Sequence, residues 1–353
     1  MTKKDSGAYA KAGVNIDEAT KAVELMKPHV RSTYNSRVVT DVGSFGGMYD
    51  VSFLEKKYEH PILVESIDGL GTKMNVAEMM NRYTVGQCIV NHCVNDILVQ
   101  GAIPLTFKNY IALAKLKSKV VEQIVAEMAI ACKYNNVPMI AGETAEMPGG
   151  QGEVVGCVTA VVERDKIIDG SKIAKDDALI GLPSSGLHTN GYSLARKAFF
   201  ETRSYTVNTY IPELGHSVGK ELLRVHKSYF NELTFLFEND VEIHGIAHIT
   251  GGGFFDNIGR LLNDKLKAEI STKWTIPPVF RLIQEIENVS DEEMRKVFNL
   301  GFGMVLIVPQ EQITNIANIF NYNGNSPSWM WLGRIVERES DEKKVVFKKG
   351  ERK

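Results

Sequence analysis

Apolar residues along the chain switch repeatedly between the spacing of strands and the spacing of helices. The first strong strand pattern, Ile62 to Val64 with Ile67, leads directly to Asp68. Residues 85–100 place apolar side chains over most of a helix circumference, so we expect this helix to be buried. Further strands are expected at 105–114, 137–142, 153–165, 176–183, 243–250, 302–309 and 330–336, and further helices at 17–26, 119–133, 220–238, 279–287 and 310–321. Residues 201–219 show neither spacing and are expected to form an irregular insertion.

The length and composition predict a globular protein of two domains. The chain has 353 residues, which is more than one hydrophobic core usually serves. It is 44% hydrophobic and 24% charged, with a mean hydropathy of −0.13. We expect an N-terminal domain over residues 1–168, a C-terminal domain over 169–345 and a solvated, charged tail at 346–353.

Charge, cysteine usage and hydropathy restrict the classes of function. Lys and Arg number 41 against 43 Asp and Glu, a formal net charge of −2 that gives no basic field for nucleic acid. The four cysteines show no CxxC spacing and lie in apolar contexts, which indicates buried thiols in a reducing compartment. No signal-peptide core and no bilayer-spanning apolar run is present. We therefore expect a soluble, cytoplasmic protein that binds neither nucleic acid nor membrane.

A polar segment at the end of the first strand carries the first candidate chemistry. Asp68 is followed by Gly69, Gly71, Thr72 and Lys73. A carboxylate, a flexible turn, a hydroxyl and an ammonium in this order can present a metal ligand and phosphate donors at one sheet edge. Because glycine-rich turns are common, the segment alone is a weak signal.

The buried helix at 85–100 carries a polar cluster. Asn91 and Asn95 are four residues apart and share a face, with Asp96 adjacent. Asn and Asp are poor helix-interior residues and need hydrogen-bond partners or a cation when they are buried. A buried polar network would explain any one of them, whereas two amides and a carboxylate together favour a functional site.

Two glycine-bearing segments of the first half are further candidates. Residues 43–47 contain Ser44 and three glycines, and they form either a mobile loop or a plain turn, with equal weight. Residues 137–150 repeat the order of the first segment, because an apolar strand is followed by Gly142, Glu143, Thr144 and Glu146. We expect a second carboxylate-bearing turn at 142–146.

Two segments of the second half are candidate anion sites. Hydroxyl, imidazole and amide side chains crowd residues 184–193 just before an expected helix start, and helix N-termini attract anions. Thr250 and the glycines 251–253 lie between a strand and a helix. A tight turn is the simpler interpretation, but three glycines cost backbone entropy that a plain turn does not need, which favours phosphate binding. The spacing matches neither the dinucleotide-binding fingerprint nor the P-loop.

Nine stretches, taken in order, carry a specific resemblance. They are YAKAGVNID (9–17), GSFGG (43–47), SIDGLGTK (66–73), VNDILVQGAIP (94–104), AGETAEMPG (141–149), IIDGSK (167–172), SSGLHTNGYSLARK (184–197), AHITGGGFFDNI (247–258) and NLGFGM (299–304). Together they resemble the phosphoribosylformylglycinamidine cyclo-ligases, also called aminoimidazole ribonucleotide synthetases. The resemblance implies an α/β (α+β type) fold of two domains, each with a mostly antiparallel sheet packed with helices. It also implies a homodimer formed through the N-terminal domains.

The resemblance implies a reaction as well. These enzymes close the ring of formylglycinamidine ribonucleotide in the fifth step of de novo purine (IMP) biosynthesis. ATP activates the formyl oxygen, the ring nitrogen attacks, and phosphate leaves. The products are aminoimidazole ribonucleotide, ADP and phosphate; Mg²⁺ is required, and a need for a monovalent cation such as K⁺ is left open.

The resemblance also assigns roles to residues. It places the nucleotide in the N-terminal domain and the substrate in the C-terminal domain, with Asp68 and Asp96 as Mg²⁺ ligands that act in catalysis beside Lys73. The nucleotide contacts are assigned to Lys27, Ser44, Gly46, Gly47, Gly69, Gly71, Thr72, Lys73, Asn95 and Glu143, with metal contact as the alternative for Glu143. The substrate phosphate is assigned to Ser184, Ser185, His188, Asn190, Thr250, Gly251, Gly252 and Gly253, with ATP at one of these two loops as the alternative. His188 is a candidate acid or base, against the simpler interpretation as an ordinary hydrogen-bonding group.

Two segments depart from the family pattern. Relatives carry Pro-Thr-x-x-Tyr where this chain reads RVHKSYF over 224–230, which keeps only Tyr229. The loop over 148–153 is short and lacks a Tyr-bearing insertion. These differences concern the substrate lid rather than the reaction.

Other enzymes and a non-enzyme compete with this interpretation. Enzymes resembling formylglycinamidine synthetase, thiamine-phosphate kinase or selenophosphate synthetase are the nearest rivals, although the last would need a cysteine within 43–47, where this chain has none. A catalytically silent nucleotide-binding scaffold is the alternative from a different class. Such a scaffold would not need Asp68, Lys73 and Asp96 together.

Overall fold

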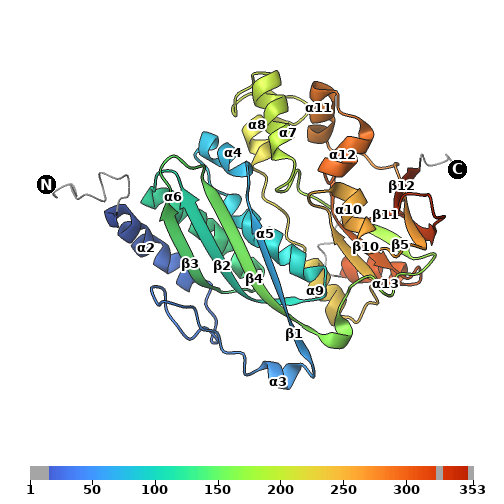
Figure 1. The fold of residues 1–353 in the computed structure, drawn as a ribbon, viewed down its shortest axis with the longest axis horizontal. Helices are drawn as coiled ribbons and strands as arrows, with labels where there is room; N and C mark the ends of the chain where they lie inside the picture. Colours follow the sequence, from blue (N-terminus) through green and yellow to red (C-terminus); the bar gives the residue numbers. More distant parts are fainter. Residues whose placement is uncertain (1–15, 323–328, 349–353) are drawn as a thin grey trace. The chain divides into compact units, whose positions relative to one another are not determined.

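The computed structural model describes residues 16–322 and 329–348, which form two compact units (Figure 1). Unit 1 comprises the described residues up to Ile97 together with Ala102–Arg164. Unit 2 comprises Leu98–Gly101 and the described residues from Asp165 onward. Residues 9–15 of the first resembling stretch and residues 349–353 of the expected tail lie outside the described residues.

Unit 1 contains a four-stranded sheet in the order β1-β4-β2-β3. Its strands are β1 (Pro61–Gly69), β2 (Ile103–Leu113), β3 (Met139–Glu146) and β4 (Glu153–Glu163). β4 is antiparallel to both β1 and β2, whereas β2 and β3 run parallel. A parallel pair requires a crossover connection, and helix α6 (Ser118–Tyr134) supplies it.

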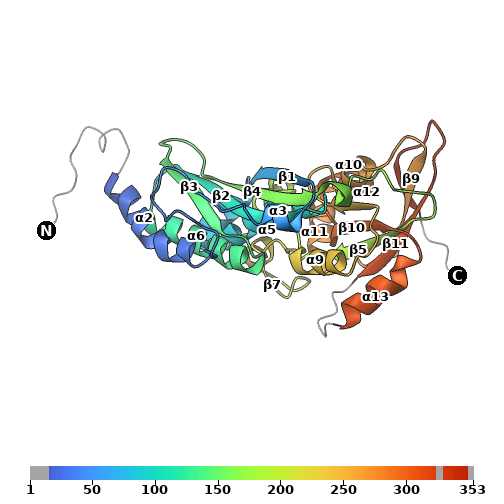
Figure 2. The ribbon, with the colours of Figure 1, turned by 90° about the horizontal axis from the view of Figure 1, so that it is seen from below.

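The helices of unit 1 are α2 (Ile16–Arg31), α3 (Leu54–Lys57), α4 (Lys73–Met80), α5 (Val85–Leu98) and α6. Figure 2 shows α5 and α6 on the same side of the sheet. Gly86 of α5 packs against the backbone of α6 at Ile124, and Ile89 of α5 approaches Gly156 of β4. Because α5 contacts both α6 and the sheet, its apolar residues are buried, as their pattern predicted.

The other face of this sheet carries exposed apolar side chains. On β1, Leu63 is 61% exposed and Ile67 is 71% exposed. Ile67 is paired in register with Cys157 of β4, and Tyr110 of β2 is also exposed. Since alternate residues of a strand point to the same face, these residues form one surface, which we call the outer sheet face.

Unit 2 contains a six-stranded sheet in the order β12-β9-β11-β5-β10-β8. Its strands are β5 (Ala178–Pro183), β8 (Gly245–His248), β9 (Leu266–Ser271), β10 (Phe302–Val308), β11 (Met330–Glu337) and β12 (Val345–Lys348), and β6 (Tyr210–Ile211) and β7 (His216–Ser217) form a separate small hairpin. Every pair in the large sheet is antiparallel except β12 with β9. Two helix-packed, mostly antiparallel sheets confirm the predicted fold class.

The helices of unit 2 are α7 (Tyr192–Arg196), the π-helix Lys197–Thr202, α8 (Val218–Leu222), α9 (Phe230–Glu238), α10 (Gly253–Gly259), α11 (Pro278–Glu287), α12 (Asp291–Val297) and α13 (Gln312–Tyr322), and a 3-10 turn at Arg164–Lys166 stands at the start of the unit. Strand β10, which pairs with β5 on one side and β8 on the other, is buried along its whole length. Across both units, none of the helices in the described ranges combines the length and apolarity needed to cross a bilayer.

Three predictions of local structure were wrong. Residues 142–146 do not form a turn but continue β3, because they pair in parallel register with 109–113 of β2. The helix predicted at 220–238 is two helices, since hydrogen bonds from Tyr192 to the Leu222 carbonyl and from Ser185 to the Val225 carbonyl hold the intervening segment. The expected charged tail is a strand as far as Lys348, because β12 pairs with β9.

Candidate functional site

Two carboxylates of unit 1 converge on one imidazole. Asp68 lies near the end of β1, and Asp96 lies on α5, one turn after His92. The Nε2 atom of His92 lies 2.9 Å from Oδ2 of Asp68 and 3.6 Å from Oδ2 of Asp96. The structure therefore brings the two predicted metal ligands together. Both carboxylates stay partly exposed, whereas His92 is buried.

The contacts within this group favour charged carboxylates. Burial would raise the pKa of Asp68, but the hydrogen bond and charge of His92 and the Gly69 N–H outweigh it, so the pKa lies below its ordinary value. Burial would lower the pKa of His92, but its contacts with the two carboxylates raise it. Asp96 also accepts a hydrogen bond from the Ser66 hydroxyl at 3.3 Å. Partly exposed, anionic oxygen ligands are the donors that Mg²⁺ prefers.

His92 is a site residue that the sequence interpretation missed. It precedes Asp96 by four residues, so the helical spacing was the available signal. The adjacent Asn91, which belongs to the polar cluster predicted on this helix, accepts a 2.8 Å hydrogen bond from the buried amide of Asn135. Asn91 thus belongs to a buried polar network, which was the simpler interpretation, and Asn95 is completely buried on the same helix.

The turn that follows Asp68 is held by Glu153, which the sequence interpretation did not include. The Oε1 atom of Glu153 accepts hydrogen bonds from the N–H groups of Leu70 at 3.0 Å and Gly71 at 3.2 Å. Lys73, next after Thr72, begins α4 and is completely buried beside Cys88, and burial lowers its pKa. A contact from Gly71 or Lys73 to a phosphate stays a prediction. To make it, the Gly71 N–H would have to leave Glu153, and the Lys73 ammonium would have to leave Cys88.

A cavity of about 170 Å³ lies beside the predicted glycine loop of unit 1. Apolar residues of α2 line one wall, Ser44 and Phe45 line another, and Gly142 and Thr144 of β3 line a third. Tyr34 also lines the cavity, and its hydroxyl is buried without a hydrogen-bond partner in the described part of the chain. The cavity therefore offers an apolar wall with a small number of polar groups, which is typical of small-molecule sites.

The loop over 43–47 is anchored at both ends. Arg31 and Asp41 form an ion pair with an Nε–Oδ1 distance of 2.8 Å, and the Arg31 contacts lower the pKa of Asp41 to about 2. At the other end Gly47 packs against the Ile140 backbone so closely that a Cβ atom would lie 2.4 Å from the carbonyl oxygen. Gly46 has open space around it.

Two predicted nucleotide contacts lie away from this cavity. Lys27 pairs with Glu24 at 2.6 Å along α2 and does not line the cavity. Glu143 follows Gly142 along β3, so its side chain points to the opposite, outer sheet face. The Oε1 atom of Glu143 accepts the N–H of Thr144 at 2.8 Å.

In unit 2, the segment over 184–190 is organised by its own hydrogen bonds. Ser184 donates to Asn299 at 2.9 Å, and Ser185 donates to the Val225 carbonyl. His188 is only 2% exposed, has a φ of 63°, and accepts the Ser185 N–H at Nε2 over 3.2 Å. These contacts agree with the simpler interpretation of His188 as a hydrogen-bonding group.

The glycines at 251–253 differ in what they require. Gly253 has a φ of 58°, and a Cβ atom there would lie 1.9 Å from the Arg295 carbonyl oxygen. Gly252 has a φ of 85°, and a Cβ atom there would lie 2.4 Å from a carboxylate oxygen of Asp256. A Cβ atom on Gly251 would meet only Asn190, 3.6 Å away, and the amide nitrogen of Asn190 is buried without a partner in the described residues. Packing thus accounts for two glycines, while Gly251 and Asn190 bring the two predicted phosphate loops together.

Two family models match this sequence. The model described as AIR synthase related protein, N-terminal domain, matches residues 56–162. The model described as AIR synthase related protein, C-terminal domain, matches residues 174–346. Together they cover most of both units.

Curated relatives named phosphoribosylformylglycinamidine cyclo-ligase match nearly the whole chain. The phosphoribosylformylglycinamidine cyclo-ligase of Alkaliphilus oremlandii is 42% identical over 335 residues, which is 93% of this chain and 97% of the relative. The enzyme of that name from Geotalea daltonii is 46% identical over 335 residues, which is 93% of this chain and 95% of the relative.

Solved structures share the fold at low sequence identity. The thiamine-monophosphate kinase from Stenotrophomonas maltophilia superposes with a TM-score of 0.68 at 13% identity, covering 92% of this chain and 95% of that one. The hydrogenase maturation protein HypE, solved in complex with ATP, gives a TM-score of 0.64 at 15% identity over 90% of this chain and 88% of that one.

Proposed function

Because the chain belongs to the AIR synthase related family, we propose that it is a phosphoribosylformylglycinamidine cyclo-ligase. It uses ATP to close the ring of formylglycinamidine ribonucleotide and yields aminoimidazole ribonucleotide, ADP and phosphate. The observation that carries this proposal is the identity of 40–46% to cyclo-ligases over more than 90% of the chain. Thiamine-monophosphate kinase, a rival, is similar only in fold at 13% identity.

The chemistry of this reaction is mainly positioning and charge neutralisation. The formyl oxygen of the substrate attacks the terminal phosphorus of ATP, and ADP leaves. The ring nitrogen then bonds to the activated formyl carbon, and the oxygen departs on phosphate. Such transfers need the reacting groups held in line and their developing negative charge balanced, rather than a covalent group from the protein.

Asp68 and Asp96 are the residues that would hold Mg²⁺. Their carboxylates face one point, remain partly exposed and supply hard oxygen donors, so the pair fits this ion. Bound Mg²⁺ would neutralise the phosphate oxygens of ATP. His92 would fix the orientation of Asp68 through their 2.9 Å contact, as an outer-shell partner does for a ligand. Turnover measured with and without K⁺ tests the need for a monovalent cation.

The cavity beside 43–47 is the proposed place for part of the nucleotide. It joins an apolar wall from α2 to the unpartnered hydroxyl of Tyr34 and to Ser44.

Thr250, Gly251 and the amide of Asn190 are the proposed groups for the substrate phosphate in unit 2. The open space at Gly251 and the unpartnered nitrogen of Asn190 support this assignment.

The outer sheet face of unit 1 is the proposed interface of a homodimer. A surface on which Ile67 is 71% exposed and Leu63 61% exposed is costly to leave in water. Sedimentation velocity of wild type and Ile67→Glu tests this assignment, with Ile130→Glu on α6, 49% exposed, as the matched control. A dimer that persists in Ile67→Glu would contradict it.

We also propose that the enzyme works in the cytoplasm.

Supplying candidate substrates in parallel tests the proposed activity. With Mg·ATP, purified protein is expected to release ADP when formylglycinamidine ribonucleotide is present and not when thiamine monophosphate replaces it. ADP release with thiamine monophosphate, or none with either substrate, would contradict the proposal.

A further inference from the structure

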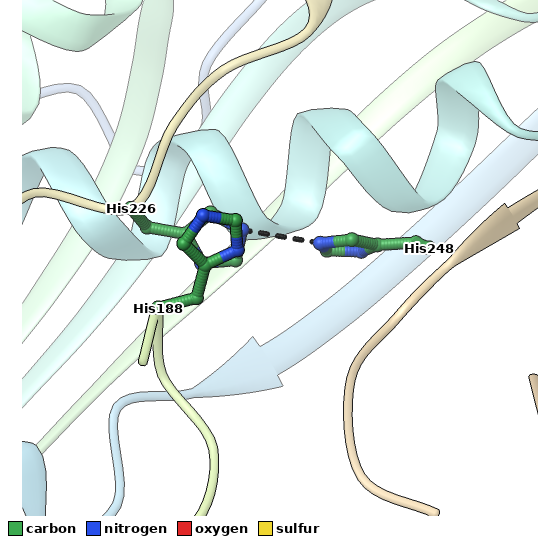
Figure 3. A group of neighbouring side chains, drawn as sticks. All are labelled: His188, His226 and His248. Carbon is green, nitrogen blue, oxygen red and sulfur yellow. Dashed lines mark hydrogen bonds between the residues drawn. The ribbon is translucent and has the colours of Figure 1, made fainter. Parts of the chain in front are cut away.

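Three buried histidines of unit 2 form a cluster in which His226 contacts both His188 and His248. His188 comes from the segment after β5, His226 from the segment between α8 and α9, and His248 from the end of β8 (Figure 3). Their exposures are 2%, 0% and 5%. Three separate parts of the chain thus place imidazoles in one small interior volume.

The distances between these rings approach those of a shared metal ion. The Nε2 atoms of His226 and His248 lie 3.1 Å apart. The rings of His188 and His226 stack with centroids 3.9 Å apart at 21°, and Figure 3 shows His248 pointing toward that pair. One nitrogen from each ring lies within 4.8 Å of the other two. Ligands at about 2.1 Å around a tetrahedral Zn²⁺ are roughly 3.4 Å apart. The nitrogens must therefore move closer, and one of the two stacked rings must turn so that its in-plane lone pair faces the same ion.

The hydrogen bonds of these rings are contacts that a bound cation would replace or that would hold a ring in place. In a neutral His226–His248 pair, one Nε2 carries the shared proton and the other accepts it, and an ion can replace that proton. His226 Nδ1 lies 3.3 Å from the Thr189 hydroxyl, which can hold the far side of the ring. His188 Nε2 accepts the Ser185 N–H over 3.2 Å, so this nitrogen carries no proton, and an ion that bound it would displace the Ser185 contact.

His226 supplies the imidazole that contacts both of the other two rings. A threonine hydroxyl is a poor ligand for the transition metals that imidazole binds well. Replacing His226 by threonine therefore removes one of the three donors and leaves a hydroxyl in its place.

We propose that His188, His226 and His248 form a site for a divalent transition metal ion of the Zn²⁺ type. Three imidazoles with one position left for water or another ligand are a known donor set for Zn²⁺. The ion joins the segment over 184–190 to the segment over 223–229 and to the end of β8, two residues before Thr250. It thereby stabilises the loops around Asn190 and Gly251. Metal binding here does not depend on the proposed cyclo-ligase activity.

Binding of Zn²⁺ to the purified protein tests the site. The titration is done in excess Mg²⁺, which occupies the Asp68–Asp96 pair and binds poorly to imidazole. Wild type is expected to bind one tightly held Zn²⁺ in unit 2. His226→Thr should weaken this binding at least as much as the roughly 10- to 100-fold loss seen when an outer-shell partner is removed.

Two control variants separate this site from other ligands. His244→Asn removes a unit 2 histidine that pairs with Asp177 and lies outside the cluster, so it should bind Zn²⁺ as wild type does. Asp96→Asn should also retain the ion. Equal binding by wild type and His226→Thr, or loss of the ion in Asp96→Asn alone, would overturn the proposal.

A measurement on wild type covers the case in which His226→Thr fails to fold. Crystals grown with Zn²⁺ are measured at the zinc absorption edge. The expected result is an anomalous peak about 2.1 Å from a ring nitrogen of each of the three histidines. A peak elsewhere, or none at the cluster, would overturn the proposal.

Discussion

The carboxylate of Asp68 contacts the buried imidazole of His92 at 2.9 Å, and the same nitrogen lies 3.6 Å from Asp96. One imidazole thus orients two carboxylates from different elements. Asp68→Asn should lower kcat at least about 100-fold while the fold persists, because a neutral amide cannot balance the charge of a metal-bound phosphate. Steady-state ADP release, with circular dichroism to verify folding, measures this effect.

Asp50→Asn is the matched control for this substitution. Asp50 is an exposed carboxylate of unit 1 that accepts a hydrogen bond from the nearby Ser52 N–H and does not contact the Asp68–Asp96 pair. It should keep wild-type turnover. Unaltered activity in Asp68→Asn would remove Asp68 from the metal site.

Gly47 and Gly46 form a pair of substitutions that tests the glycine loop. Gly47→Ala places a methyl group 2.4 Å from the Ile140 carbonyl oxygen, so the loop or β3 must shift, at a cost of about 1–3 kcal/mol. We expect a lower Tm and a higher KM for ATP. Gly46→Ala meets open space and should leave Tm unchanged. A KM for ATP that stays at the wild-type value in Gly47→Ala would show that the loop does not position the nucleotide.

The glycines at 251 and 253 separate folding from phosphate binding. Gly253→Ala should destabilise unit 2 strongly, because its φ is 58° and a methyl group would overlap the Arg295 carbonyl. Gly251→Ala has room beside Asn190 and should fold normally. If the backbone at Gly251 approaches the substrate phosphate, Gly251→Ala raises the KM for formylglycinamidine ribonucleotide without changing Tm. Normal KM in this variant would place the phosphate elsewhere.

The predictable part of the site consists of features that local sequence determines. The all-round apolar pattern of α5 predicts its burial, and the placement of Asp68 and Asp96 at one strand end and on one buried helix made them candidate ligands. His92 was missed because a lone histidine in an apolar helix is most often a core residue. The contact of Glu153 with Gly71 depends on the pairing of β4 with β1, which one sequence does not reveal.

Other errors have the same physical origin in tertiary contacts. The apolar spacing at 220–238 is helical throughout, yet bonds from Ser185 and Tyr192 hold the segment before Phe230 out of the helix. Lys73 looked like a phosphate ligand because its position in sequence does not say which way the side chain turns. In the structure it turns inward to Cys88.

His244 should make the stability of unit 2 depend on pH. Burial would lower its pKa, but its contacts with Asp177 at 2.8 Å and Glu242 at 3.1 Å raise it above the ordinary value. A raised folded-state pKa adds stability that is fully present below the unfolded pKa of about 6.5 and is lost as pH rises through the folded pKa. His244→Asn should therefore destabilise the protein more at about pH 5.5 than at about pH 9. Urea unfolding at both pH values measures this difference, and an equal loss at both would contradict the assignment.

The fate of the formyl oxygen tests the proposed activity most directly. Formylglycinamidine ribonucleotide labelled with ¹⁸O in its formyl group is incubated with the protein and Mg·ATP, and the released phosphate is analysed by mass spectrometry. Ring closure through an activated formyl oxygen predicts one ¹⁸O atom in phosphate for each aminoimidazole ribonucleotide formed. Unlabelled phosphate, or ADP release without the aminoimidazole product, would contradict the account.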